Sequence, residues 1–368
     1  KYRTGKPTST PKSGTVMLFS NGLRPTAIVI GCWLSGPVLL AVWTGIFLLR
    51  MDWMSFLVVP SYLMMFKLPD WKLRSSFWLA MILLTVASRD PWRLAFSLSV
   101  AIFASPVILD FRLRSWPGFL PFMEKGFKNF TARCELKGLE NAQKDRTVFA
   151  FHPHGAISFG FTVNGLFDSQ FLNKSKKISF LIDDFLRNGN PIFRLLCDVY
   201  EFENRQIASA EKSTVHRLME EGRNVALVLG GFEEATVCET GKDRVVVNSR
   251  KGIVKYCLQH GYRLQPVYSF GEDETYHFAP GLLDFRLWLN RFKIPAVAFF
   301  GNPVLPWLPR SQARILTVVG EAIQCPHIPS PTPEEVDYWL QSYAKALQAT
   351  FNQWKAEAGR PQAELEIF

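Results

Sequence analysis

The segment TVFAFHPHG, residues 147–155, indicates the fold class of this chain more directly than any other stretch. Thr147–Phe151 is a short run of apolar and β-branched residues, which is typical of a buried strand. His152 and His154 follow it at once; the proline between them restricts the backbone, and Gly155 permits a tight turn. Open α/β sheets bind their ligands at such carboxyl ends of strands, so a site is predicted here.

Outward from this segment, apolar strand patterns alternate with helical patterns through the rest of the chain. Further strands are predicted at Ile178–Ile182, Asn224–Leu229, Arg263–Tyr268, Ala296–Phe300 and Arg314–Val319. Helices are predicted at Ala208–Glu221, Arg250–His260, Leu282–Arg291 and Pro333–Ala358, with Gly222 and Gly261 where C-terminal caps belong. We therefore expect an α/β fold with a mostly parallel sheet flanked by helices on both faces.

The N-terminal third differs in composition, because it contains long uncharged, apolar runs. The 368-residue chain is 48% apolar and has a mean hydropathy of +0.05, which argues against a disordered protein and against an ordinary soluble enzyme. Residues 25–49 run 25 positions without a charge, long enough for a membrane-spanning helix. Residues 53–66, 75–88 and 94–109 are uncharged runs of 14, 14 and 16 residues, which fit re-entrant, interfacial or core helices better.

The charge distribution supports a membrane surface as the partner of this region. The net charge is +10, and residues 1–114 carry thirteen Lys or Arg against four acidic residues. Basic residues between apolar, Trp-rich runs are typical of contact with anionic lipid, and the chain has no nucleic-acid-binding motif. We expect a mobile basic N-terminus at 1–22, a helical membrane-anchoring region at 23–114 and an α/β domain at 115–368.

Six cysteines form no CxxC pair, so reduced thiols are expected rather than disulfides or a zinc site. The His-x-His of the first segment lacks the further Asp and His of the HxHxDH metal pattern, because Ala156 and Ile157 stand in their places. No metal site is predicted. The two histidines fit a general base with a positioning partner, while two turn histidines bonded to backbone remain the alternative.

Three more groups of residues lie at predicted strand ends or helix starts. Paired Gly230 and Gly231 follow a strand and let backbone N–H groups approach a ligand, and Glu234 offers a carboxylate that orients a histidine or hydroxyl. Arg250, Lys251 and Gly252 open a helix, where the two cations suit phosphate groups. Gly271 and Glu272 follow the strand that ends at Tyr268–Phe270, on the same edge of the sheet. A GxSxG elbow, a GxxxxGK[ST] loop and GxGxxG are absent.

Taken together, HPHG at 152–155, GGxxEA at 230–235 and the run from Arg250 to Glu272 ending in PVYSFGE resemble the diacylglycerol O-acyltransferase type 2 family. That family includes monoacylglycerol and wax-alcohol acyltransferases. The resemblance extends from Ser115-Trp116-Pro117 through Val318-Val319-Gly320 to the C-terminal segment beginning PTPEEVDYW. It implies a glycerolipid acyltransferase-like α/β fold and acyl transfer from acyl-CoA to a glyceride hydroxyl, with acyl-CoA as a substrate and no cofactor.

The resemblance also implies roles for individual residues. His154 is expected to be the catalytic base, supported by His152 and by Glu234. A neutral histidine takes the proton that the hydroxyl loses as it attacks the thioester, so no covalent intermediate is needed. The expected substrate-binding residues are Gly155, Gly230, Gly231, Arg250, Lys251, Gly252, Gly271 and Glu272.

The acceptor and the location are also matters of expectation. The leading reading is esterification of diacylglycerol to triacylglycerol at the cytosolic face of the endoplasmic reticulum, with lipid droplets as a second location. Monoacylglycerol or a fatty alcohol is the alternative acceptor, and a catalytically silent lipid-droplet scaffold is the alternative class; an oligomer is compatible with either. The His-x4-Asp pattern of phospholipid-pathway acyltransferases is absent, since Ile157 and Phe159 occupy the two positions where its Asp would stand.

Overall fold

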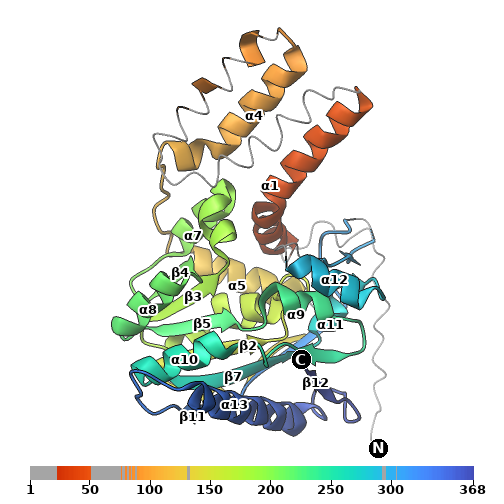
Figure 1. Ribbon diagram of the computed structural model, residues 1–368. Helices are drawn as coiled ribbons and strands as arrows, with labels where there is room; N and C mark the ends of the chain where they lie inside the picture. The colour runs from red at the N-terminus through yellow and green to blue at the C-terminus, as the bar shows by residue number, and fades with distance from the viewer. Residues whose placement is uncertain are drawn as a thin grey trace, which may run out of the picture.

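The computed structural model describes residues 23–50, 89–130, 133–291, 296–303 and 305–368, together with positions 76, 79–80, 83 and 85–87. The predictions for 1–22 and 53–66, and for most of 75–88, lie outside the described residues. The chain forms a mixed α/β body, and helices of the N-terminal third project from it (Figure 1).

An eight-stranded sheet forms the centre of this body, and most of its neighbouring strands are parallel. Along it lie β1 (Arg133–Lys137), β10 (Arg314–Val319), β7 (Arg263–Phe270), β2 (Thr147–His152), β5 (Asn224–Val228), β3 (Ile178–Ile182) and β4 (Arg205–Ser209), while β11 (Ile323–Gln324) pairs with β7. The β10–β7 and β11–β7 pairs are antiparallel and the others are parallel. The predicted mostly parallel sheet is therefore confirmed.

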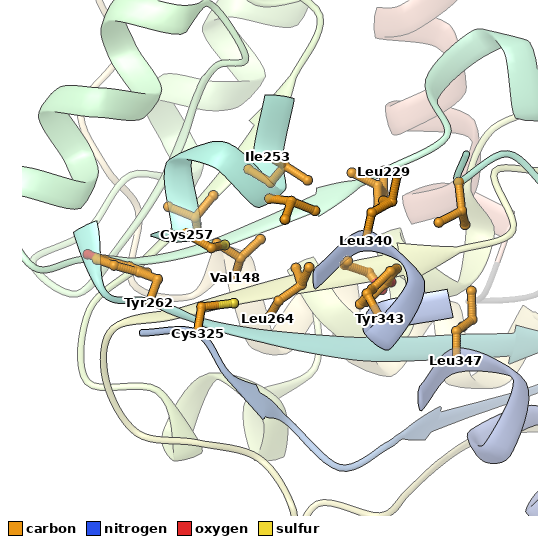
Figure 2. Close-up of a cluster of buried hydrophobic side chains, with 14 of the residues drawn as sticks. Val148, Leu229, Ile253, Cys257, Tyr262, Leu264, Cys325, Leu340, Tyr343 and Leu347 are labelled. Atoms are coloured by element: carbon orange, nitrogen blue, oxygen red, sulfur yellow. The ribbon is translucent and has the colours of Figure 1, made fainter. Parts of the chain in front are cut away.

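The alternation of side chains along β2 builds a core on each face of the sheet. Val148 and Ala150 face the cluster formed with α8 (Lys212–Glu220), α10 (Lys251–His260) and α13 (Pro333–Trp354), which Figure 2 shows. Phe149 and Phe151 face a cluster rich in phenylalanine from α5 (Phe119–Phe130), η2 (Phe161–Leu166), α6 (Ser169–Lys174) and α7 (Pro191–Tyr200). Because the period is two, His152 lies on the α13 side.

Several predicted elements differ in extent from those observed. The helix predicted from Ala208 begins at Lys212, because Ala208 and Ser209 belong to edge strand β4. The strand predicted at Ala296–Phe300 shortens to β9 (Phe299–Phe300), which pairs with β8 (His277–Phe278) outside the main sheet. The helix predicted at Leu282–Arg291 is α12 (Leu283–Asn290). Gly261 caps α10 in the left-handed conformation, at φ 62°, as its position predicted.

The remaining elements are short and lie around the sheet. They are η3 (Phe185–Gly189), α9 (Gly231–Val237), α11 (Glu272–Thr275) and the β6–β12 pair (Asp243–Val245 with Leu365–Ile367). The long helix α13 begins with a capping box, in which Thr332 and Glu335 bond to each other's backbone N–H groups. This cap fixes the start of the helix that covers one face of the sheet.

Helices α1 (Leu23–Leu49) and α4 (Pro91–Ile108) project from the body, and both contact α7 (Figure 1). No single described helix is long and apolar enough to cross a membrane. The halves of α1, Arg24–Gly36 and Val38–Leu49, meet the length and composition together, but they are bent by 49°. Residues 25–49 were predicted to form one unbroken spanning helix, but the structure has two helical halves with a bend between them.

The bend in α1 is held by the α/β body. Pro37 lacks an N–H group, so the carbonyl of Trp33 loses its usual helical donor. The side-chain amide of Asn190 donates instead to the carbonyls of Cys32 at 3.0 Å and Trp33 at 3.2 Å. Its oxygen accepts from the backbone N–H of Phe193 as the N-cap of α7. One residue thus joins the bend to the start of α7.

Candidate active site

Three of the predicted loops meet at one edge of the sheet. Strand β2 lies between β7 and β5, and in register His152 pairs with Tyr268 while Phe151 pairs with Val228. The three strands are parallel, so their carboxyl ends bring together the histidine segment, the paired glycines before α9, and Gly271 before α11. The prediction that these loops share one edge is confirmed.

His152 is fully buried and both of its ring nitrogens have partners. Its Nδ1 lies 2.9 and 3.1 Å from the two carboxylate oxygens of Glu234, which is equally buried. Its Nε2 lies 2.9 Å from the hydroxyl of Tyr343 on α13. The ring is therefore fixed between α9 and α13, and no face of it reaches solvent.

Gly230 makes room for the carboxylate that holds His152. A Cβ atom at position 230 would lie 1.6 Å from Oε2 and 2.5 Å from Cβ of Glu234, well inside van der Waals contact. The guanidinium of Arg250 lies over the same turn, 2.5 Å from the carbonyl of Gly230 and 2.5 Å from Glu233. In the GGxxE pattern, the glycine at position 230 is therefore needed because the Glu234 side chain packs directly against the turn.

His154 has different surroundings. It is half-buried, and its Nδ1 lies 3.1 Å from the carbonyl of Gly155, which only accepts; Nδ1 therefore carries the proton. No hydrogen bond joins its Nε2 to another residue in the described part of the chain, so that nitrogen has a lone pair to offer. Burial, as the largest effect, lowers the pKa of His154 below its usual 6.5, so the ring is neutral at pH 7.

Glu272 holds the loop that carries His154. Its buried carboxylate accepts hydrogen bonds from the backbone N–H of Phe159, at 3.1 Å, and of Gly160. A Cβ atom at Gly155, which has φ +58°, would lie 2.7 Å from Oε2 of Glu272. Burial raises the pKa of Glu272 to about 8, against the opposing effect of the two N–H donors. These contacts give Glu272 and Gly155 a role in fixing the loop.

Glu272 therefore predicts a pH-dependent stability. Between the ordinary pKa of 4.5 and about 8, the folded chain retains a proton that the unfolded chain has lost, so stability falls as pH rises through this window. Glu272→Gln removes this titration. Thermal unfolding of both proteins from pH 5 to 8 is expected to show the variant gaining on the wild type as pH rises. A constant difference across that range would contradict the raised pKa.

The other predicted binding residues lie near the same edge. Gly271, at φ +89°, faces β10, where a Cβ atom would lie 2.0 Å from the carbonyl oxygen of Arg314; close packing accounts for this glycine. Gly231, at φ +55°, has open space beside it. Lys251 pairs with Asp337 of α13 at 2.5 Å, and Gly252 is exposed with nothing near its Cβ position.

Tyr343 is the site residue that sequence reasoning missed. It is one of several apolar and aromatic residues on the buried face of α13, and no local motif distinguishes it from core packing. Within the described ranges, no three of the His, Cys, Asp and Glu side chains come together in a way that suits a metal ion. The chemistry that this arrangement offers is proton transfer by a neutral imidazole beside a fixed imidazole–carboxylate pair.

A family model and several relatives match this chain. The family model described as "Diacylglycerol acyltransferase" matches residues 130–368, which contain every site residue above. Diacylglycerol O-acyltransferase 2 of Dictyostelium discoideum is 32% identical over 58% of this chain and 67% of that protein. The protein of that name in Homo sapiens is 30% identical over 59% of each chain. Diacylglycerol O-acyltransferase 2-like protein 6 of Homo sapiens is 30% identical over 65% of this chain and 75% of the relative.

The match to the first of these relatives spans about two thirds of its length, and to the second about three fifths. Among solved structures, the 1-acyl-sn-glycerophosphate acyltransferase PlsC of Thermotoga maritima covers 90% of this chain and 96% of its own. The TM-score of this match is 0.36 and the sequence identity is 11%.

Proposed function

The chain belongs to the diacylglycerol acyltransferase family, and from this premise we propose that it transfers an acyl group from acyl-CoA to the hydroxyl of diacylglycerol, forming triacylglycerol. The observation that carries the proposal is the pair of differently held histidines at the carboxyl end of β2. One ring is fixed by Glu234, and the other offers an unprotonated Nε2. A hydroxyl acceptor requires one base of this kind.

In the proposed reaction His154 acts first. Its Nε2 accepts the proton of the acceptor hydroxyl while the hydroxyl oxygen forms a bond to the thioester carbonyl carbon. The resulting tetrahedral intermediate collapses with cleavage of the carbon–sulfur bond, and CoA leaves as a thiolate that takes up the proton from His154. The acyl group passes directly to the acceptor, so neither an acyl-enzyme nor a cofactor is part of the scheme.

The remaining residues serve this step by position. Glu234 holds His152, which forms the strand end from which the loop continues to His154. Glu272 holds the other end of the loop through the N–H groups of Phe159 and Gly160. The loop is thereby fixed at both ends, and fixed geometry is what makes proton transfer in a bound complex fast.

The test is an acyl-transfer assay with microsomes that contain the expressed chain, labelled oleoyl-CoA and a panel of acceptors. Triacylglycerol formed from diacylglycerol supports the proposal. Diacylglycerol formed from monoacylglycerol, or wax ester formed from a long-chain alcohol, would assign the alternative acceptors. Absence of every product, with the protein present at normal level, would favour a silent scaffold.

Substitution of Gly252 tests whether acyl-CoA reaches the start of α10. Its Cβ position is open, so Gly252→Ala leaves the fold unchanged, and alanine is the better helix former. If the CoA phosphates approach this helix end, the added methyl group is expected to raise KM for acyl-CoA about tenfold while kcat holds. An unchanged KM would remove Gly252 from the binding site. Gly45→Ala in α1, where a Cβ atom also meets open space, is the control.

We also propose that residues 115–368 form the catalytic unit, that 23–114 attach it to the endoplasmic reticulum or a lipid droplet, and that the catalytic unit faces the cytosol, where acyl-CoA is available. Asn129 and Asn173 lie in N-x-Ser/Thr sequons, and both side chains are exposed. With the unit in the cytosol, neither is glycosylated. No mobility shift is expected on glycosidase treatment of protein from mammalian cells; a shift abolished by substituting these asparagines would reverse the orientation.

A further inference from the structure

The hydroxyl of Tyr343 is a buried polar group in an otherwise apolar helix face. Tyr343 lies between Leu340 and Leu347 along α13, packed against the sheet (Figure 2), and its side chain is inaccessible to solvent. Its oxygen lies 2.9 Å from Nε2 of His152 and 3.5 Å from the carbonyl of Ala150. Burial keeps the pKa of Tyr343 well above its usual value, so the phenol remains a donor at any working pH.

The partners of His152 decide which nitrogen carries the proton. Both oxygens of Glu234 lie on the Nδ1 side, at 2.9 and 3.1 Å, and a carboxylate only accepts, so Nδ1 is the protonated nitrogen. Nε2 then has a lone pair, which accepts from the Tyr343 hydroxyl. The contact of the same hydroxyl with the carbonyl of Ala150, at 3.5 Å, is longer, so Nε2 is the nearer acceptor for the phenol proton.

This arrangement also separates the two histidines by role. The lone pair of His152 is taken up by Tyr343, so an acceptor hydroxyl finds no base there, whereas His154 retains an unoccupied Nε2 on the loop. Tyr343 comes from the far end of the chain and reaches the end of β2 across the core. The packing of α13 therefore helps to fix the His152 ring, which precedes the loop that carries His154.

We propose that Tyr343 is a positioning residue, which holds His152 as the Nδ1–H tautomer between Glu234 and α13 and so leaves His154 as the base. Only the expected effect of Tyr343 on kcat rests on the proposed acyl transfer. The hydrogen-bonding state of His152 is a property of the folded chain and is measured without substrate. Loss of one positioning hydrogen bond is expected to lower kcat about tenfold and to leave KM for acyl-CoA unchanged.

The first measurement is nitrogen NMR of the full chain in detergent, labelled with ¹⁵N-histidine, with His152 identified by the signals lost in His152→Gln. We expect a protonated Nδ1 and an unprotonated, hydrogen-bonded Nε2. In Tyr343→Phe, which keeps the ring, the Nε2 signal should move toward that of an unbonded nitrogen. A protonated Nε2 in the wild type, or an unchanged signal in the variant, would overturn the proposal. This result stands even where no acceptor is esterified, a failure that would count against the proposed function alone.

The second measurement is a double-mutant cycle on kcat with Tyr343→Phe and His152→Gln. If Tyr343 acts through His152, the Tyr343→Phe change has no further effect once His152 is replaced. Independent tenfold losses in both backgrounds would indicate general loosening of α13 and reject the positioning role. Tyr338→Phe is the matched control, because Tyr338 lies on the same helix with 64% of its surface exposed and should not change kcat.

Discussion

Replacing His154 with alanine is expected to lower kcat by about 10²- to 10⁴-fold, the range typical of a lost general base, while protein level and thermal stability are retained. The physical reason is that His154 provides the accessible imidazole nitrogen at the strand end, whereas His152 is fully buried and bonded at both nitrogens. The side chain of His154 is only half-buried, so its loss leaves no large cavity. Acyl transfer from labelled oleoyl-CoA is the measurement, with unfolding temperature recorded in parallel.

Three comparisons make this result informative. His327→Ala removes an exposed histidine remote from the loop and should leave activity unchanged. Near-normal activity of His154→Ala together with an inactive His152→Ala would reverse the two roles. Activity of both variants would reject base catalysis by this segment. Burial lowers the pKa of His154, so its imidazole stays unprotonated down to below pH 6.5. As the pH is lowered, kcat should therefore begin to fall only below pH 6.5.

Gly230→Ala is expected to reduce kcat by about 10²-fold or more, although the change adds only one methyl group and touches no substrate. The new Cβ would occupy the place of the Glu234 carboxylate, which must swing away from His152. The Nδ1 proton then has no buried acceptor, and the ring loses its fixed orientation. Strain in the tight turn is expected to cost about 1–3 kcal/mol of stability as well.

The control is Gly222→Ala, in the turn after α8. Gly222 has positive φ, at +69°, whereas Gly230 has φ −72°, and a Cβ atom at position 222 meets nothing; this variant therefore introduces backbone strain without any collision. It should lose some stability and keep its kcat. Equal activity of Gly230→Ala and Gly222→Ala would show that the Glu234–His152 contact is dispensable. Glu234→Gln removes the carboxylate without altering the turn, and loss of activity in this variant would support the same explanation.

The sequence predicted the centre of the fold well, because its strands are buried on both faces. Strands β3 and β10 were predicted at their observed bounds, and β2, β5 and β7 to within two residues, since continuous apolar runs mark them clearly. The edges were harder. Strand β1 (RCELK) and strand β4 (RQIAS) are mostly polar, and among the described strands each pairs with one neighbour, β10 and β3 respectively.

The candidate site was predictable to the extent that it follows strand ends. The motifs placed His152, Glu234 and Glu272 at three such ends, and the parallel sheet brings those ends together. What each side chain contacts could not be read from the motifs. Glu272 bonds to backbone N–H groups, and Tyr343 reaches His152 from a helix whose only visible pattern is an amphipathic repeat. Such contacts depend on tertiary packing, which leaves no local signal.

The parallel pairing of β1 with β10 also has a consequence for how the protein is made. During synthesis β1 leaves the ribosome before most of the sheet exists, and β10, its partner among the described strands, follows after β7. Until then β1 is an unpaired segment beside the exposed phenylalanine-rich face of a partial sheet. Pairings this distant in sequence form slowly and leave apolar surface open to aggregation. The nascent chain should therefore depend on chaperones until β10 emerges.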